Sequence, residues 1–173
     1  KMESCRQKGL VSKSYVFFLG RENFPFHYVQ GARYKLGQAQ ILKTTDKDKS
    51  VAIFALGSMV PQALQAAENL EKVGIGAYVI DPVVLNVWDA GQMNSWIQKV
   101  KGKVLVVEDH QEVGGYGQFL ASKVAQAGIP LHLKVHAVQG VFGQSAYNAI
   151  DLYKQNRLDA QAIEKSSMEF FEK

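Results

Sequence analysis

The residues best suited to chemistry in this sequence lie in one short segment, 108–112. It contains Glu108, Asp109, His110 and Glu112. Carboxylates and an imidazole that converge at the end of a strand could bind a metal ion or serve as general acid and base. The alternative is an exposed, charged turn from which the four side chains point outward in different directions.

Two glycines, Gly114 and Gly115, follow this segment, and a third stands at Gly117. Glycine allows a tight turn from a strand into a helix and a close approach of that helix to the sheet. The first N–H groups of such a helix can hold an anion. The glycines therefore predict either a small-anion site at Gly114 and Gly115 or a requirement of packing alone, because this spacing is a weak signal.

Arg21 is a second candidate, at a distance from that segment. It follows a strongly apolar segment, 15–19, which predicts a buried strand. Ligands favour the carboxyl ends of strands, and a planar guanidinium suits phosphate or carboxylate. Alternatively, Arg21 pairs with Glu22 or with a helix end. Because the strand needs neighbours and position 1 is not Met, we expect the sequence to be a fragment of a longer polypeptide.

An α/β sheet would position these candidates. Residues 104–107 are apolar and three of them are β-branched, which is typical of a central strand covered on both faces. Further strands are predicted at 37–43, 51–56 and 77–80. Helices are predicted at 60–73, after Asp89 and after Gly115, and Asp159 is expected to cap a last helix.

Residues 131–138 alternate between apolar and polar side chains, which predicts an edge strand with one face in water. His132, Lys134 and His136 lie on the polar side. The two histidines could bind a metal, but no third ligand is near in sequence, so we expect a solvated face. We also expect the tail, 169–173, to fray.

These elements predict an α/β fold with three α/β/α layers, a mostly parallel sheet of about five strands and one edge strand that could be antiparallel. At 173 residues, 47% hydrophobic and 21% charged, the composition is that of a soluble globular domain. The net charge of +4 is scattered, which predicts no nucleic-acid partner. A single cysteine excludes an internal disulfide, and no apolar run approaches the ~20 residues of a membrane span, so a cytoplasmic protein is expected.

The segment VLVVEDHQEVGGYGQFLASKV, preceded by VAIFALGSMVPQALQAAENLEKVGIGAYVIDP, resembles the C-terminal domain of transketolase. The similarity covers about 37–173, and GRENFP upstream resembles the end of the pyrimidine-binding domain. The resemblance therefore divides the sequence into 1–36, the end of that domain plus a linker, and 37–173, the C-terminal α/β domain. Deoxyxylulose-phosphate synthase and 2-oxo acid dehydrogenase β subunits share this fold and remain alternatives.

The resemblance implies transfer of a two-carbon ketol unit between sugar phosphates, with thiamine diphosphate and a divalent cation, Mg or Ca, in the full-length enzyme. It implies that Arg21 contacts the substrate phosphate and that this chain supports the dimer and the substrate channel. The sequence lacks the diphosphate-binding and metal-binding segments, so we expect no cofactor and no turnover in this chain alone. Expected partners are sugar phosphates, the remaining transketolase domains or subunit, and a second copy in a homodimer. The alternative is a freestanding α/β module that binds a small anion.

Overall fold

The computed structural model describes residues 16–17, 31, 35 and 37–172, and the strand predicted at 104–107 lies inside a five-stranded sheet, with a strand on each side of it. The strands are β1 (Gln40–Thr44), β2 (Ser50–Ala55), β3 (Gly76–Asp81), β4 (Lys103–Gln111) and β5 (His132–Val138). Their order is β1-β3-β2-β4-β5. β4 runs parallel to β2 and to β5, and β1 is antiparallel to β3 at one edge. The predicted mixed sheet is thus confirmed.

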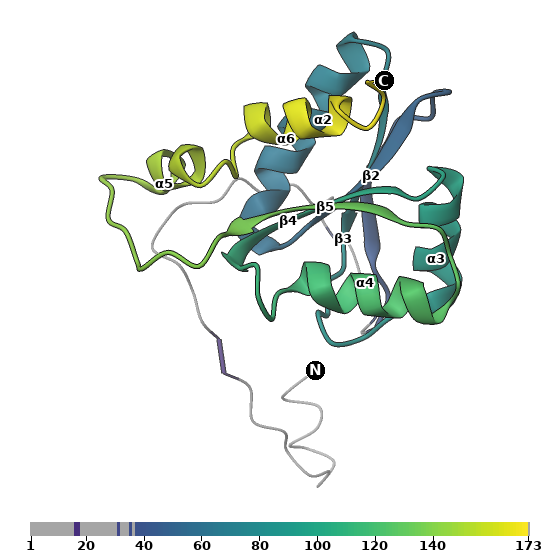
Figure 1. The fold of residues 1–173 in the computed structure, drawn as a ribbon, viewed down its shortest axis with the longest axis horizontal. Helices are drawn as coiled ribbons and strands as arrows, with labels where there is room; N and C mark the ends of the chain where they lie inside the picture. The colour runs from purple at the N-terminus through teal and green to yellow at the C-terminus, as the bar shows by residue number, and fades with distance from the viewer. Residues whose placement is uncertain (1–15, 18–30, 32–34, 36, 173) are drawn as a thin grey trace, which may run out of the picture.

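Helices cover both faces of the sheet (Figure 1). α2 (Val60–Lys72) and α6 (Ala160–Met168) cover one face, whereas α3 (Ala90–Lys99) and α4 (Tyr116–Gln126) cover the other. A short 3-10 turn, η1 (Gly57–Met59), precedes α2, and α5 (Ala149–Gln155) lies between β5 and α6. The predicted α/β/α layering is confirmed.

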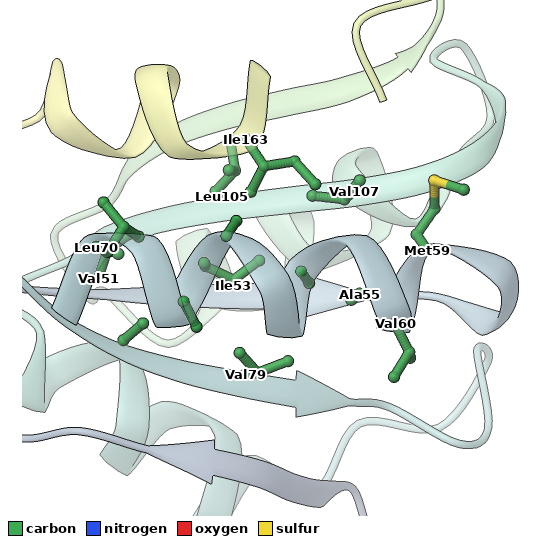
Figure 2. Packing of buried hydrophobic residues seen from close by; sticks show 14 of the residues in the cluster. Val51, Ile53, Ala55, Met59, Val60, Leu70, Val79, Leu105, Val107 and Ile163 are labelled. Atoms are coloured by element: carbon green, nitrogen blue, oxygen red, sulfur yellow. The ribbon is translucent and has the colours of Figure 1, made fainter. Parts of the chain in front are cut away.

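Alternation along the strands divides the core into two clusters. In β4, Leu105 and Val107 face α2 and α6, whereas Val104 and Val106 face α3 and α4. Figure 2 shows the first cluster, in which Leu70 of α2 lies near Val51 and Ile163 of α6 lies near Leu105. Each fully buried aliphatic side chain contributes about 1.5–3 kcal/mol through the hydrophobic effect.

The predicted capping by an aspartate side chain is confirmed for α3 and wrong for α6. The Asp89 carboxylate accepts a hydrogen bond from the Gln92 N–H at 3.2 Å and so caps α3 as predicted. Asp159 occupies the corresponding position of α6, but its side chain makes no capping hydrogen bond. β1 begins at Gln40, later than the predicted start at residue 37.

The prediction of a solvated face on β5 is wrong, because α6 lies over it. The Lys134 ammonium donates to the Ser166 carbonyl at 3.0 Å and pairs with the Glu169 carboxylate at 2.6 Å. His136 also reaches Ser166, with Nε2 2.8 Å from the Ser166 hydroxyl. Lys134 and His136 therefore find polar partners on α6 and directly after it.

The predicted fraying of the tail is also wrong as far as residue 171. The Phe170 side chain is only 7% exposed and meets the His132 ring edge-on, with centroids 4.8 Å apart. The Lys134 ammonium lies 4.8 Å from the centroid of the Phe170 ring, within cation–π range. The end of the described chain is thus packed on β5.

Some predictions fall outside the described residues. Arg21 and most of the strand predicted at 15–19 are among them. Within the described part of the chain, no helix is long and apolar enough to cross a bilayer.

Candidate functional site

A cleft of about 960 Å³ opens where the carboxyl ends of β2, β3 and β4 meet at one edge of the sheet. Open α/β sheets bind ligands at this edge. One wall is apolar and comprises Leu56, Val83, Leu85, Tyr116 and Phe119. The polar side chains are Ser58, Asp81, Asn86, Glu108, Asp109 and His110.

Glu108 is not part of an exposed turn, because β4 continues to Gln111. Its side chain is 1% exposed. One carboxylate oxygen accepts the Tyr116 N–H at 2.7 Å and the other accepts the Gly117 N–H at 3.0 Å. A carboxylate at this position satisfies two N–H groups of the first turn of α4 and interacts favourably with the helix dipole. Glu108 therefore fastens the start of α4 to β4.

The other members of the predicted cluster do not converge with Glu108 on a shared ligand. Asp109 and His110 are exposed. Asp109 accepts a hydrogen bond from the Ser58 hydroxyl at 3.3 Å, and His110 Nδ1 lies 2.9 Å from the Gln111 carbonyl. Glu112 does not line the cleft. Among the described residues, no group of three His, Cys, Asp or Glu could hold a metal ion, so the geometry gives no support to a metal site at this segment.

Close packing requires two of the glycines at this edge, Gly115 and Gly117, whereas the backbone conformation favours the third, Gly114. A Cβ on Gly115 would lie 2.6 Å from a Glu108 carboxylate oxygen, and a Cβ on Gly117 would lie 2.7 Å from Val135 Cγ2. Gly114 has a φ of +80°, a left-handed conformation that glycine adopts readily. Gly115 and Gly117 therefore allow α4 to lie directly against β4 and β5.

The N–H groups at the start of α4 already have acceptors within the chain. The Gly114 N–H donates to the Gln118 side chain at 2.9 Å, and the Gly115 N–H donates to the Glu112 carbonyl at 3.2 Å. The next two N–H groups donate to Glu108. A small anion at Gly114 and Gly115 would have to displace these acceptors, so the geometry favours the packing interpretation.

Two aromatic residues that sequence analysis did not single out, Tyr116 and Phe119, line the cleft. The rings of Tyr116 and Phe119 have centroids 5.8 Å apart, and Trp88 meets Phe119 edge-on at 6.3 Å. Burial raises the pKa of the Tyr116 hydroxyl, and the nearby Asp81 and Glu108 charges raise it further. The phenol is therefore neutral over the physiological range. In the sequence, the position of Tyr116 between Gly115 and Gly117 was the signal that could have identified it as a site residue.

The loop after β3 contributes a strained residue to the cleft. Val83 has a φ of +62°, and its N–H donates to an Asp81 carboxylate oxygen at 2.8 Å. A left-handed conformation is unfavourable for a β-branched residue and costs on the order of 1–3 kcal/mol. Backbone strain of this kind clusters at ligand sites, which supports the cleft as the candidate functional site.

Relatives are found among transketolases. A protein from Methanocaldococcus jannaschii named as a transketolase C-terminal section is 33% identical over 142 residues, which are 82% of this chain and 42% of that protein. Human transketolase is 34% identical over 113 residues, covering 64% of this chain and 18% of the enzyme. The chain therefore spans less than half of the length of these relatives.

Solved structures share the fold. A chain described as split gene transketolase, inactive beta4 tetramer, superposes with a TM-score of 0.75 at 26% identity, covering 87% of this chain and 46% of that one. Transketolase from Campylobacter jejuni gives a TM-score of 0.56 at 19% identity over 77% of this chain and 18% of its own, which shows the fold alone. The family model for the transketolase C-terminal domain matches residues 37–164. The chain belongs to the transketolase C-terminal domain family.

Proposed function

We propose that this chain is the C-terminal section of a thiamine-diphosphate-dependent transketolase, which transfers a two-carbon ketol unit between sugar phosphates. The match of the family model to residues 37–164 carries this proposal. In the same proposal, residues 1–36 are the end of the pyrimidine-binding domain and a linker, and the enzyme is cytoplasmic. The M. jannaschii relative supports a separate C-terminal section, because its name describes one.

The cleft of this chain does not suit thiamine diphosphate. Its charged side chains are the carboxylates of Asp81, Glu108 and Asp109, and no Lys or Arg occurs among the described residues that line it. A diphosphate needs cationic side chains, free N–H groups or a metal ion to balance its charge. The proposal therefore assigns thiamine diphosphate and its Mg or Ca ion to other parts of the transketolase and assigns no catalytic residue to this chain.

The proposed contribution of the chain is to the substrate phosphate and to assembly. Arg21 is the proposed phosphate contact, on the strength of its GRENFP context and of guanidinium geometry. The rest of the chain would support the dimer and the substrate channel together with the remaining transketolase domains or subunit. The tetrameric state of the split gene transketolase chain supports a role in assembly.

Isothermal titration tests this proposal, with a sugar phosphate and thiamine diphosphate titrated separately into the chain. We expect weak binding of the sugar phosphate, loss of that binding in Arg21→Ala, and no heat from thiamine diphosphate. Arg157→Ala is the matched control, because Arg157 is an exposed arginine on the α5–α6 turn, and it should bind as the wild type does. Tight binding of thiamine diphosphate would contradict the assignment of the cofactor to other parts of the enzyme.

A further inference from the structure

The cleft at the carboxyl ends of β2, β3 and β4 lies where the order of the strands reverses. The chain passes from β2 through α2 to β3 on one side of β2, and from β3 through α3 to β4 on the other side. The helices that follow β2 and β4, α2 and α4, therefore cover opposite faces of the sheet (Figure 1). Their loops separate and leave a crevice between the two strand ends. Open α/β sheets bind ligands in the crevice at such a switch point.

The size and the wall of the cleft suit a small organic molecule. Its volume is about 960 Å³, and ligand pockets commonly span roughly 300–1,000 Å³. The rings of Tyr116 and Phe119 line it, with centroids 5.8 Å apart. Across the crevice, the Ser58 hydroxyl after β2 donates to the Asp109 carboxylate of β4 at 3.3 Å. A ligand that fits this cleft has an apolar body that can pack on the two rings.

The ionisable side chains of the cleft determine the charge of that ligand. Asp81, Glu108 and Asp109 line it, together with His110, and within the described part of the chain no Lys or Arg does. Asp81 and Glu108 accept hydrogen bonds from backbone N–H groups, which satisfy oxygen atoms but leave the negative charges in place. These charges would repel an anion. A neutral ligand would remove water from the carboxylates without compensating their charge, which costs free energy.

The negative charges also act on the aromatic wall. Burial raises the pKa of the Tyr116 hydroxyl, and the Asp81 and Glu108 charges raise it further because they oppose a negative phenolate. The same electric field favours a positive charge at this wall. The faces of aromatic rings attract cations as well, and more strongly where water is excluded. Aromatic rings and carboxylates in one cleft therefore complement an organic cation.

We propose that the cleft binds an organic cation, an ammonium group carried by an apolar body. The apolar body packs on Tyr116 and Phe119, and the ammonium group lies toward Asp81 and Asp109. A metal ion does not suit the site, because no group of three potential ligands among the described residues could hold one. The proposal goes beyond the transketolase role and does not depend on it, since it involves neither Arg21 nor thiamine diphosphate.

Isothermal titration of the full chain with three compounds of similar shape tests the charge preference. Phenethylammonium is the probe, phenethyl alcohol is its neutral analogue and hydrocinnamate is its anionic analogue. We expect phenethylammonium to bind about tenfold more tightly than the alcohol, and hydrocinnamate not to bind. Added salt should weaken the binding of phenethylammonium alone, because salt screens charge attraction. Absence of phenethylammonium binding, equal binding of the alcohol, or tighter binding of hydrocinnamate would overturn the proposal.

Two variants test whether phenethylammonium binds in the cleft. Asp81→Asn keeps an oxygen that can accept the Val83 N–H but removes the charge, and it should weaken binding about fivefold. Phe119→Leu keeps an apolar side chain but removes the ring, and it should weaken binding about three- to tenfold. Asp48→Asn is the matched control, because Asp48 is exposed between β1 and β2 and does not line the cleft. It should bind as the wild type does.

Circular dichroism checks the fold of each variant, and Asp109→Asn, at an exposed position, repeats the charge test if Asp81→Asn does not fold. Folded Asp81→Asn or Asp109→Asn and Phe119→Leu variants that all bind phenethylammonium as the wild type does would overturn the assignment to the cleft. Arg21→Ala should bind it normally. A chain that binds phenethylammonium but no sugar phosphate would remove the Arg21 assignment and keep the cation site, whereas the reverse result would remove only the cation site. The two failures are therefore distinguishable.

Discussion

Neighbouring strands β4 and β5 each carry an ionisable side chain that holds a helix against the sheet, but on opposite faces. Glu108 on β4 binds the start of α4, and His136 on β5 binds the α5–α6 turn and α6. By residue type both were candidates for chemistry. The comparison shows that an ionisable side chain within a strand can be fully engaged in joining that strand to a helix.

The two attachments differ in whether the ionisable side chain accepts or donates its hydrogen bonds. Glu108 accepts hydrogen bonds from two backbone N–H groups. His136 Nδ1 lies 2.6 Å from the Arg157 carbonyl, which can only accept, so Nδ1 carries the hydrogen. In the neutral ring Nε2 then accepts from the Ser166 hydroxyl. Burial lowers the pKa of His136, and the Lys134 charge lowers it further, although the hydrogen bond to Arg157 opposes the shift.

The largest expected effect comes from breaking the Glu108 attachment. Glu108→Ala removes two charge-assisted hydrogen bonds and leaves the N–H groups of Tyr116 and Gly117 buried without an acceptor, so we expect a loss of about 3–5 kcal/mol in the free energy of unfolding. Urea denaturation followed by circular dichroism measures it. Asp109→Ala is the control, because Asp109 is the exposed neighbour and should change stability by about 0.5 kcal/mol or less. Equal effects of the two changes would contradict the attachment.

A smaller loss is expected when α4 is pushed away from the sheet. In Gly117→Ala the new methyl group would lie 2.7 Å and 3.0 Å from the two Val135 methyl carbons, so we expect a cost of about 1–3 kcal/mol despite the higher helix propensity of alanine. Gly91→Ala in α3 is the matched control, since the nearest atom to its Cβ would be 3.8 Å away. Gly91→Ala should raise the free energy of unfolding by up to about 1 kcal/mol, measured by thermal or urea denaturation. A stabilised Gly117→Ala would show that α4 is not in close contact with β5.

The smallest expected effect is that of the His136 attachment, and it depends on pH. The pKa of His136 is lower in the folded chain than in the unfolded chain. Near and below the unfolded pKa, the unfolded chain therefore binds more protons than the folded chain does. The stability that neutral His136 contributes is therefore present above the unfolded pKa of about 6.5, and it declines as the pH falls below that value. His136→Gln should cost about 1–2 kcal/mol near neutral pH through its lost hydrogen bonds. It should also make the free energy of unfolding less dependent on pH below about 6.5.

His110→Gln serves as the control for that pH series, because His110 is exposed and should retain the wild-type slope. Urea midpoints at a series of pH values give the comparison. A wild-type chain whose stability rises on acidification through this range would contradict the sign of the His136 shift.

The sheet and its interior strand β4 could be predicted because their signals are local. Val104, Val106 and Glu108 share one face of β4 by simple alternation, and α4 begins on that face. The signal for Glu108 was thus present in the sequence. It was hidden because four titratable residues within five positions are typical of a turn, whereas β4 continues until Gln111 pairs with Val138 after a shift in register.

The covering of β5 by α6 could not be predicted from local patterns. The alternation of His132, Lys134 and His136 is that of a strand facing water, and the groups that satisfy them lie some thirty residues later in sequence. Their partners include a backbone carbonyl and a hydroxyl, neither of which carries a hydrophobic signature. Residue 21, the predicted phosphate contact, lies outside the described residues, so its role stays a prediction.

The left-handed backbone at Val83 has an evolutionary consequence. Random substitution at this position would favour Gly or Asn, which relax the conformation at little steric cost, over a β-branched residue. Related sequences that keep a branched side chain there would therefore indicate selection for an occupant of the cleft, whereas drift to glycine would indicate that only the turn matters. The history of a single position would then distinguish a retained binding surface from an inherited scaffold.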